Sequence, residues 1–269
     1  MVGFRYRILF PGGRKKALTL SYDDGMIYDR QLVDMFDRYR LKATFHLSSG
    51  KLGESGEDEY VREDEIEELY EGHEISGHFV NHAHGTQLNR GRLLNEVLED
   101  RRKLEELSGS IVRGMSYPYG EFSDDIVNVI RAAGIEYSRT VNSTGSFSLP
   151  SDFLRWNPTC HHNNAKQYID RFLNPFGYED MMLFYIWGHS FELNREGTWS
   201  MMEDMCRRLA GHEDVWYATN IEVKDYVSAI RSLITDVDDS RIYNPSGTEI
   251  WIEADGSVRT VGALETIRI

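Results

Sequence analysis

An α/β fold built on a mainly parallel sheet is predicted by three features of this 269-residue sequence. Short β-prone runs alternate with amphipathic segments of helical period over about 230 residues. Seven such strand–helix units imply parallel strands covered by helices. The Gly-x-Gly-x-x-Gly and Gly-x-x-x-x-Gly-Lys signatures of nucleotide-binding folds follow none of the strands. The pattern leaves an open doubly wound sheet and a closed barrel as alternatives.

The strands are expected at short apolar runs. In chain order they are Ala17–Tyr22, Ala43–Leu47, Glu74–His78, Ile111–Ser116, Ile135–Thr140, Met182–Trp187 and Val215–Ala218. The helices between them carry apolar residues on one face. They are expected at Arg30–Arg40, Glu63–Glu71, Arg92–Leu107, Ser123–Ala133, Ala165–Leu173 and Ser200–Leu209, and from an Asn220 cap to about Ile234. Gly72 and Gly109 are expected to end the second and third helices.

The end of the chain follows a different pattern. Thr248–Glu253 alternates with period two, and Asp255-Gly256 is a hairpin signal. We therefore expect residues 236–269 to form a small antiparallel β extension packed on a main domain of residues 1–235. An extension of about 30 residues buries too little surface to fold alone.

Composition limits the classes of partner. Acidic residues number 44 and basic residues 30, so the net charge is −14 and no broad footprint for nucleic acid is expected. No apolar run reaches the roughly 18 residues that a membrane span needs. The N-terminal segment has no apolar core of a secretory signal, and the two cysteines, Cys160 and Cys206, are expected to be reduced thiols. These features favour a cytoplasmic location and leave the oligomeric state open.

Polar side chains follow four of the predicted strands. Asp23 and Asp24 follow the first, His78 and His82 the third, the segment 117–120 (Tyr-Pro-Tyr-Gly) the fourth, and His189 the sixth. In both candidate folds the carboxyl ends of parallel strands gather the chemistry, so these groups are expected on one rim.

Two imidazoles spaced i, i+4 and one carboxylate form a donor set suited to Zn²⁺ with an open position for water. Each part alone has a more ordinary explanation: Asp-Asp-Gly is usually a turn, and a lone His189 is usually a satisfied polar residue. The adjacent His161 and His162 are expected at the surface or in a supporting role rather than as ligands. The prediction of a catalytic site depends on all four groups of polar residues lying on one rim.

The combination of these motifs resembles that of the polysaccharide deacetylases of the NodB-homology type, carbohydrate esterase family 4. The Thr-Phe-Asp-Asp-Gly motif of the family resembles residues 21–25, and its His-Ser/Thr-x-x-His motif resembles residues 78–82 with the Gly-His-Glu-Ile sequence of residues 72–75 before it. Its Arg-x-Pro-Tyr/Phe-Gly motif resembles residues 116–120, and its Leu-x-His motif is approximated by residues 186–189. The likeness covers Leu18 to about Tyr226.

The resemblance implies a distorted (β/α)₇ barrel and removal of N-acetyl, or alternatively O-acetyl, groups from a carbohydrate. Asp24, His78 and His82 would hold a divalent metal that activates water, most often Zn²⁺, with Co²⁺, Ni²⁺ or Mn²⁺ as alternatives. Asp23 would be the general base and His189 the general acid. The backbone N–H of Tyr119 would bind the oxyanion.

The sequence departs from the family pattern at Ser116, where the family often has the arginine that supports the base. We hypothesise that Arg139 or Arg155 replaces that cation. The family's fourth motif, which buttresses the acid histidine, is matched only loosely by residues 152–156. Four aromatic residues near predicted loop ends are candidates to stack on the sugar: Trp156, Trp187, Phe191 and Trp199. Tyr117 is also expected to contact the substrate.

Two alternatives remain. The first is hydrolysis of a cyclic amide or imide on the same scaffold, which suits a cytoplasmic enzyme with a small substrate. The second is a catalytically silent carbohydrate-binding module, favoured by the missing arginine and the loose fourth motif. Absence of bound metal, with Asp23 held in a salt bridge, would favour the silent module.

Overall fold

The computed structural model describes residues 6–56, 58–177 and 179–269. Its centre is a curled sheet in which every paired strand runs parallel to its neighbour. The strands are β2 (Lys16–Asp24), β3 (Ala43–Leu47), β4 (Glu74–Gly77), β5 (Gly114–Ser116), β6 (Tyr137–Arg139), β7 (Cys160–His161), β8 (Met182–His189) and β9 (Val215–Tyr217). Their order is β6-β5-β4-β3-β2-β8-β7, with β9 beside the first half of β2. The predicted parallel α/β fold is confirmed, and all seven predicted strands are present.

Strand β7 was not predicted, because its two residues are too short to show a period. It matters because the segment of residues 156–161 connects the two edges of the sheet. Trp156 N donates to Ser138 O of β6 at 3.0 Å, and Thr159 N donates to Tyr185 O of β8 at 2.8 Å. The sheet therefore curls like a barrel wall with this segment between its ends.

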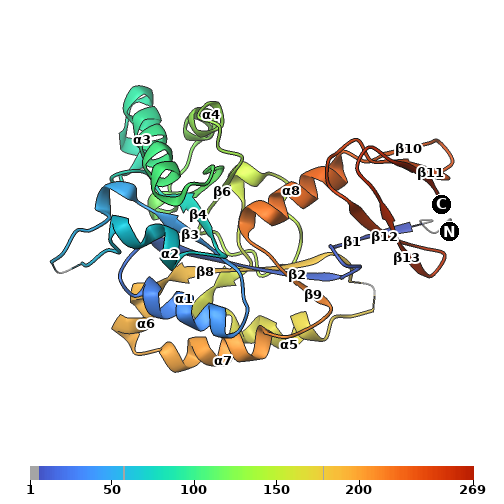
Figure 1. Cartoon of the computed structure of the whole chain (residues 1–269), viewed down its shortest axis with the longest axis horizontal. Coiled ribbons are helices and arrows are strands. Elements are labelled where there is room, and N and C mark those ends of the chain that lie inside the picture. Colours follow the sequence, from blue (N-terminus) through green and yellow to red (C-terminus); the bar gives the residue numbers. More distant parts are fainter. Residues whose placement is uncertain (1–5, 57, 178) are drawn as a thin grey trace.

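Helices cover both faces of the sheet (Figure 1). They are α1 (Asp29–Arg38), α2 (Ile66–Leu69), α3 (Arg90–Ser108), α4 (Asp124–Ala132), α5 (Lys166–Leu173), α6 (Ser190–Glu196), α7 (Trp199–Leu209) and α8 (Asn220–Arg231). In Figure 1, α1, α5 and α7 lie below the sheet, and α3 and α4 lie together at the upper left. None of the helices in the described parts of the chain combines the length and hydropathy needed to cross a bilayer.

Three helix ends correct or confirm the sequence expectations. The N-cap of α8 is Thr219 rather than Asn220, because Thr219 and Glu222 form a reciprocal capping box. Asn220 is instead buried and donates to the Tyr185 hydroxyl at 2.6 Å. Helix α2 ends at Leu69 with Tyr70 as its C-cap, so Gly72 does not end it. Gly109 does cap α3, with a φ of 64°.

The C-terminal residues form two small antiparallel sheets. Their strands are β10 (Ile234–Thr235), β11 (Arg241–Tyr243), β12 (Ile250–Ala254), β13 (Ser257–Val261) and β14 (Thr266–Arg268). The hairpin predicted at Asp255-Gly256 joins β12 to β13. Unexpectedly, β12 also pairs with β1 (Tyr6–Leu9), so the two ends of the chain lie side by side (Figure 1). The expectation that the N-terminal segment contains no secretory signal also depends on residues 1–5, which lie outside the described residues.

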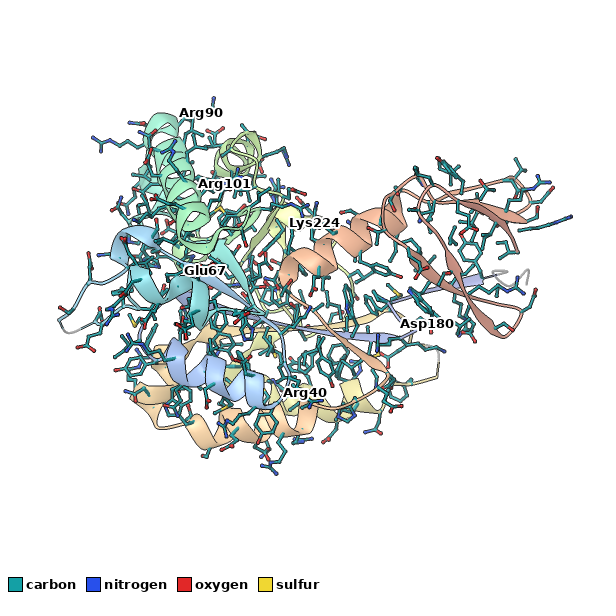
Figure 2. The ribbon with its side chains drawn as sticks, viewed as in Figure 1. Arg40, Glu67, Arg90, Arg101, Asp180 and Lys224 are labelled. Atoms are coloured by element: carbon teal, nitrogen blue, oxygen red, sulfur yellow. The ribbon has the colours of Figure 1, made fainter. Side chains whose placement is uncertain are left out.

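Three buried clusters hold the layers together. The largest joins β2, β3 and β8 to α1, α5 and α7. A second joins the other face of the sheet to α8 and to the C-terminal strands, through residues such as Leu183, Val223 and Ile252. The third lies under α3 and α4. Charged side chains such as Arg90 project from the outside of the helices (Figure 2), and both cysteines are buried and unpaired in the described chain.

Candidate active site

The parallel register brings the predicted polar residues to one level of the sheet. Asp23, near the end of β2, is the register partner of His46 on β3 and of His189 at the end of β8. Ser116, at the end of β5, is the partner of Arg139 on β6. The predicted rim at the carboxyl ends of the strands therefore exists.

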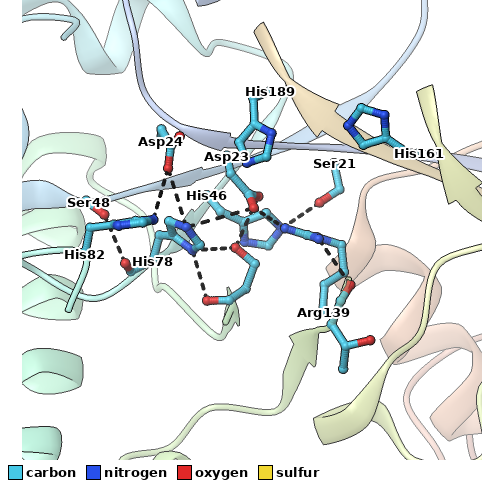
Figure 3. A network of polar contacts seen from close by, with 12 residues as sticks. Ser21, Asp23, Asp24, His46, Ser48, His78, His82, Arg139, His161 and His189 are labelled. Carbon is cyan, nitrogen blue, oxygen red and sulfur yellow. Dashed lines mark hydrogen bonds and ion pairs between the residues drawn. The ribbon is translucent and has the colours of Figure 1, made fainter. Parts of the chain in front are cut away.

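Asp24, His78 and His82 point toward one another (Figure 3). Asp24 Oδ1 lies 3.5 Å from His78 Nε2 and 3.5 Å from His82 Nε2. The same oxygen is buried and has no hydrogen-bond partner. Burial raises the pKa of Asp24, so a carboxylate here needs a cation to stabilise it. Two imidazoles and one carboxylate therefore fit a divalent cation such as Zn²⁺.

The ring of His78 is fixed by its surroundings. Its Nδ1 lies 2.7 Å from Ser116 Oγ and 3.0 Å from Ser116 O. Its backbone N–H donates to Asp100 Oδ2 at 2.8 Å. Burial holds the pKa of His78 well below its usual value, so the ring is neutral and its Nε2 can bind a metal.

The backbone is unusual at this site. Asp24, Phe79, His82 and Tyr119 all have left-handed φ values, between 51° and 84°. Non-glycine residues rarely adopt this conformation, and it concentrates where surrounding structure imposes it for function. Gly77 serves a different purpose, because a Cβ there would lie 2.9 Å from Asp100 Oδ2. The sharp turns aim the candidate ligands inward.

Asp23 lies deeper and is paired with Arg139, as hypothesised from the sequence. Ser116 Oγ donates to its other oxygen at 3.1 Å. Although burial opposes ionisation, the Arg139 guanidinium and then His78 hold the pKa of Asp23 well below its usual value. The Trp187 ring lies 4.4 Å from the Arg139 guanidinium carbon and supports it.

Arg155, the other candidate cation, is elsewhere. It pairs with Asp152 at 2.5 Å and with Asp124 at 2.6 Å. Arg139 alone of the two therefore replaces the arginine that the family carries at the position of Ser116.

His189 lies beside Glu192, a residue that the sequence analysis missed. His189 Nδ1 is 3.3 Å from Glu192 Oε2. Burial lowers the pKa of His189, but the interaction with the Glu192 carboxylate, followed by Asp23, outweighs it and raises the pKa. A signal was available: a glutamate three residues after a polar residue at a helix start is the capping-box pattern, and His189 and Glu192 form that box.

A cleft of about 590 Å³ opens over Asp24 and His82. Its walls combine aromatic rings with polar and charged groups. They come from Asp24, Met26, Tyr28, Lys51, Asp58, Glu59, Tyr60, Asn81, His82, Tyr119, Phe191, Asn194 and Arg195.

The expected substrate contacts of Tyr117 and Trp156 are corrected by the structure. Both side chains are only 1% exposed, because they complete the hydrophobic clusters beneath the rim. Tyr117 donates to Leu154 O at 2.7 Å. Trp187, 8% exposed, lies under Arg139 rather than among the described residues that line the cleft. The aromatic residues that line the cleft are Tyr28, Tyr60, Tyr119 and Phe191. Phe191 was among the aromatic residues expected from the sequence to stack on a sugar, whereas Tyr28 and Tyr60 were not singled out.

The curled parallel sheet, with carboxylates and imidazoles at its carboxyl ends, defines an α/β fold of the NodB type. The crystal structure of a proposed polysaccharide deacetylase from Mycobacterium smegmatis shares this fold, with a TM-score of 0.63 and 15% identity. The match covers 83% of this chain and 94% of the other.

The family follows from sequence. Residues 11–138 match the model of the polysaccharide deacetylase family, which confirms the resemblance seen in the sequence motifs over this part of the chain. Peptidoglycan-N-acetylmuramic acid deacetylase PdaC of Bacillus subtilis is 26% identical over 114 residues, 42% of this chain and 23% of that protein. The chitooligosaccharide deacetylase of Sinorhizobium fredii is 28% identical over 123 residues, 44% of this chain and 54% of that one. The matched segments thus span about half or less of these curated relatives.

Proposed function

We propose that this chain is a metal-dependent hydrolase that removes N-acetyl groups from a carbohydrate. One observation carries the proposal: the Asp24, His78 and His82 donor atoms converge within 4.8 Å of one another, and Asp24 and His82 line an open cleft. The family match and the deacetylase activities of the relatives supply the reaction class.

The donor set fits a divalent cation because Asp24 Oδ1 is buried and unpartnered between two imidazoles. When bound, such a cation supplies Lewis-acid polarisation of an acyl oxygen and of water. Zn²⁺ is our first choice because two nitrogens and one carboxylate form a borderline-soft set.

Asp23 and His189 divide the proton transfers. Asp23 stays ionised beside Arg139, so it is able to accept a proton from the attacking water. Although burial opposes it, the pKa of His189 is raised, chiefly by Glu192, which favours the protonated form that can donate to the departing nitrogen. Water adds to the acyl carbon, the C–N bond breaks, and the products are acetate and a free amine.

Tyr119 occupies the turn that faces His82. Its ring lies 4.5 Å from the His82 ring and stacks on His84 at 3.8 Å. We assign its backbone N–H to the oxyanion that develops on the acyl oxygen when water adds to the acyl carbon. One such donor typically contributes about 3–4 kcal/mol to transition-state binding.

The cleft suits a sugar better than an apolar ligand. Tyr60, Tyr119 and Phe191 offer ring faces for stacking, and Asn81 and Asn194 offer amides for hydroxyl groups. A volume of about 590 Å³ lies within the usual range for small-ligand sites.

The test is acetate release from chito-oligosaccharides by zinc-loaded protein, compared with turnover of cyclic imides. We expect acetate release, and expect His82→Ala to abolish it while also losing zinc from the Asp24 site. His212→Ala is the matched control, because His212 lies before β9 at the opposite end of the sheet. Turnover of imides alone would replace the proposal with the cyclic-imide hydrolase.

A second candidate is a catalytically silent carbohydrate-binding module. The observation that favours it is the pairing of Asp23 with Arg139 inside the protein. Sugar binding without acetate release, in protein shown to hold zinc at the Asp24 site, would establish this candidate and exclude deacetylation.

A further inference from the structure

Three more potential metal ligands converge where β7 meets α6. His161 ends the segment of residues 156–161 and His162 follows it, and Glu192 lies in the first turn of α6. His161 Nε2 lies 2.9 Å from Glu192 Oε2, and His162 Nε2 lies 3.7 Å from the same oxygen. One donor atom from each residue lies within 4.8 Å of the others.

His162 is the observation that points to a ligand. Its side chain is fully buried, and neither ring nitrogen has a hydrogen-bond partner. Buried polar groups are normally paired, because an unpaired one loses its hydration without compensation. Tyr22 stacks on one side of the ring at 5.9 Å, and a Cβ at residue 188 would lie 2.0 Å from Nδ1, so Gly188 makes room for the ring. His162 is thus a buried imidazole whose Nε2 lies 3.7 Å from Glu192 Oε2 and is available to a ligand.

The other two donors are equally well placed. His161 Nδ1 accepts from Asn163 N at 3.4 Å, which leaves Nε2 facing Glu192. Burial raises the pKa of Glu192, but His161 and His189 outweigh it and lower the pKa, so the group is a carboxylate. Burial lowers the pKa of His162 to about 3, so that ring is neutral. Neutral imidazole and carboxylate are the forms that bind metal.

We propose that His161, His162 and Glu192 form a second divalent-cation site, distinct from the Asp24–His78–His82 set. Two imidazole nitrogens and one carboxylate oxygen favour Zn²⁺, whose bonds of about 2.0–2.2 Å separate ligand atoms by roughly 3–3.5 Å. The observed separations of 2.9 and 3.7 Å from Glu192 Oε2 bracket that value.

The position of this site suggests its purpose. It links the segment of residues 156–161 to the start of α6, and so ties one edge of the sheet to the strand end that carries His189. Glu192 Oε2 also lies 3.3 Å from His189 Nδ1. Figure 3 shows His189 between Asp24 and His161. A cation at the second site would therefore fix the carboxylate that orients His189, without touching the substrate cleft.

The test counts bound zinc after equilibrium dialysis, by mass spectrometry of the metal. Wild-type protein should bind about two equivalents, and His82→Ala and Glu192→Gln about one each. Together the two substitutions should leave about none. Glu196→Gln is the matched control, because Glu196 is exposed one turn later on the same helix. His161→Ala, at a partly exposed residue, provides a second variant at the site.

Thermal unfolding gives an independent readout. In the His82→Ala background, zinc should raise the melting temperature, since a ligand of the folded state stabilises it. Adding Glu192→Gln should remove that rise, and adding Glu196→Gln should not. If the Glu192→Gln and His161→Ala variants keep the zinc content of wild-type protein, the second site is refuted and the cluster is only a hydrogen-bond network. Loss of zinc only in His82→Ala would have the same meaning and leave the proposed function intact.

Discussion

Asp23 and its partners show how one residue exchange was accommodated. Ser116 is too short to neutralise a carboxylate, but it donates to Asp23 and also contacts His78. The charge comes instead from Arg139, its register partner on β6. The cation beside Asp23 therefore lies one strand along the sheet from Ser116, and Trp187 packs against it.

Replacing Asp23 by Asn should separate catalysis from metal binding. The amide keeps the shape of the side chain but accepts no proton, so kcat for acetate release should fall by about 10²–10⁴. Zinc content should stay at the wild-type value. Asp58→Asn removes an equal charge from an exposed position on the cleft wall and should leave kcat nearly unchanged. Wild-type turnover by Asp23→Asn would show that another group is the base.

Arg139 is predicted to position and tune Asp23 rather than touch the substrate. Burial raises the pKa of Asp23, and the Arg139 guanidinium is the main group that lowers it. The Arg139→Gln substitution removes that positive charge, so the pKa of Asp23 should rise. The acidic limb of the kcat/KM profile should therefore move to higher pH. Arg139→Lys should restore it, and Arg155→Gln should not move it. An unmoved limb in Arg139→Gln would contradict the assignment.

At the scale of single residues, the sequence motifs predicted the site residues that lie within the motifs themselves and few others. The Asp-Asp-Gly and His-x-x-x-His patterns placed Asp24, His78 and His82, because each pattern lies at the end of a strand. Arg139 was one of two candidates, since sequence spacing does not give strand register. Tyr117 was assigned to the substrate because it lies in a motif, although its side chain points into the core.

The helices are held to the sheet by charge as well as by apolar packing. Arg113, just before β5, donates to Glu136 at 2.6 and 2.8 Å and to Asp225 of α8 at 2.7 and 2.8 Å. Lys224 of α8 also contacts Glu136, and Figure 2 shows it on the side of α8 near β6. The network joins two strand starts to the last helix of the barrel.

The contribution of this network to stability should depend on pH. Arg113, with help from Lys224, lowers the pKa of Glu136 to about 2. In the unfolded chain the Glu136 carboxyl has a pKa of about 4.3. The stabilisation from its ionised form is therefore complete above about pH 4.3, and it is lost as the pH falls toward the pKa of Glu136 in the folded protein. Glu136→Gln should therefore lower the urea midpoint at pH 7 and change it little near pH 2. Glu99→Gln, which breaks an exposed pair with Arg102, should have a small effect throughout. An equal loss at both pH values in Glu136→Gln would exclude an electrostatic origin.

Elements were predictable in proportion to their length. Strands β2 and β8 are nearly continuous buried runs, and α3 has many turns in which to show its period. Strand β7 and helix α6 were missed because two and seven residues carry too few repeats. The helix predicted at Glu63–Glu71 begins where the structure has it, because the 3₁₀ turn Glu63–Glu65 leads directly into α2, but the prediction extends two residues beyond Leu69.

At the scale of the whole molecule, a strand near the N-terminus pairs with a strand near the C-terminus. Strand β1 pairs with β12 over four residues, a contact between positions that no local pattern connects. Tyr226 of α8 donates to Leu9 O at 2.6 Å and accepts from Trp251 N at 3.1 Å. The C-terminal strands share a buried cluster with the sheet and α8. This packing supports the proposal that residues 236–269 are an extension of the main domain.

Ile252 tests whether the extension and the barrel unfold together. Its side chain is fully buried between β12 and the main domain, so Ile252→Ala should destabilise the protein by about 2–5 kcal/mol through lost burial and a cavity. If the parts are one cooperative unit, the loss appears as a shift of a single calorimetric transition. Val258→Ala, at a residue 52% exposed on the next strand, should change stability by less than about 0.5 kcal/mol. A separate early transition in Ile252→Ala, with the transition of the barrel and its zinc content unchanged, would show that the extension unfolds by itself and is a domain in its own right.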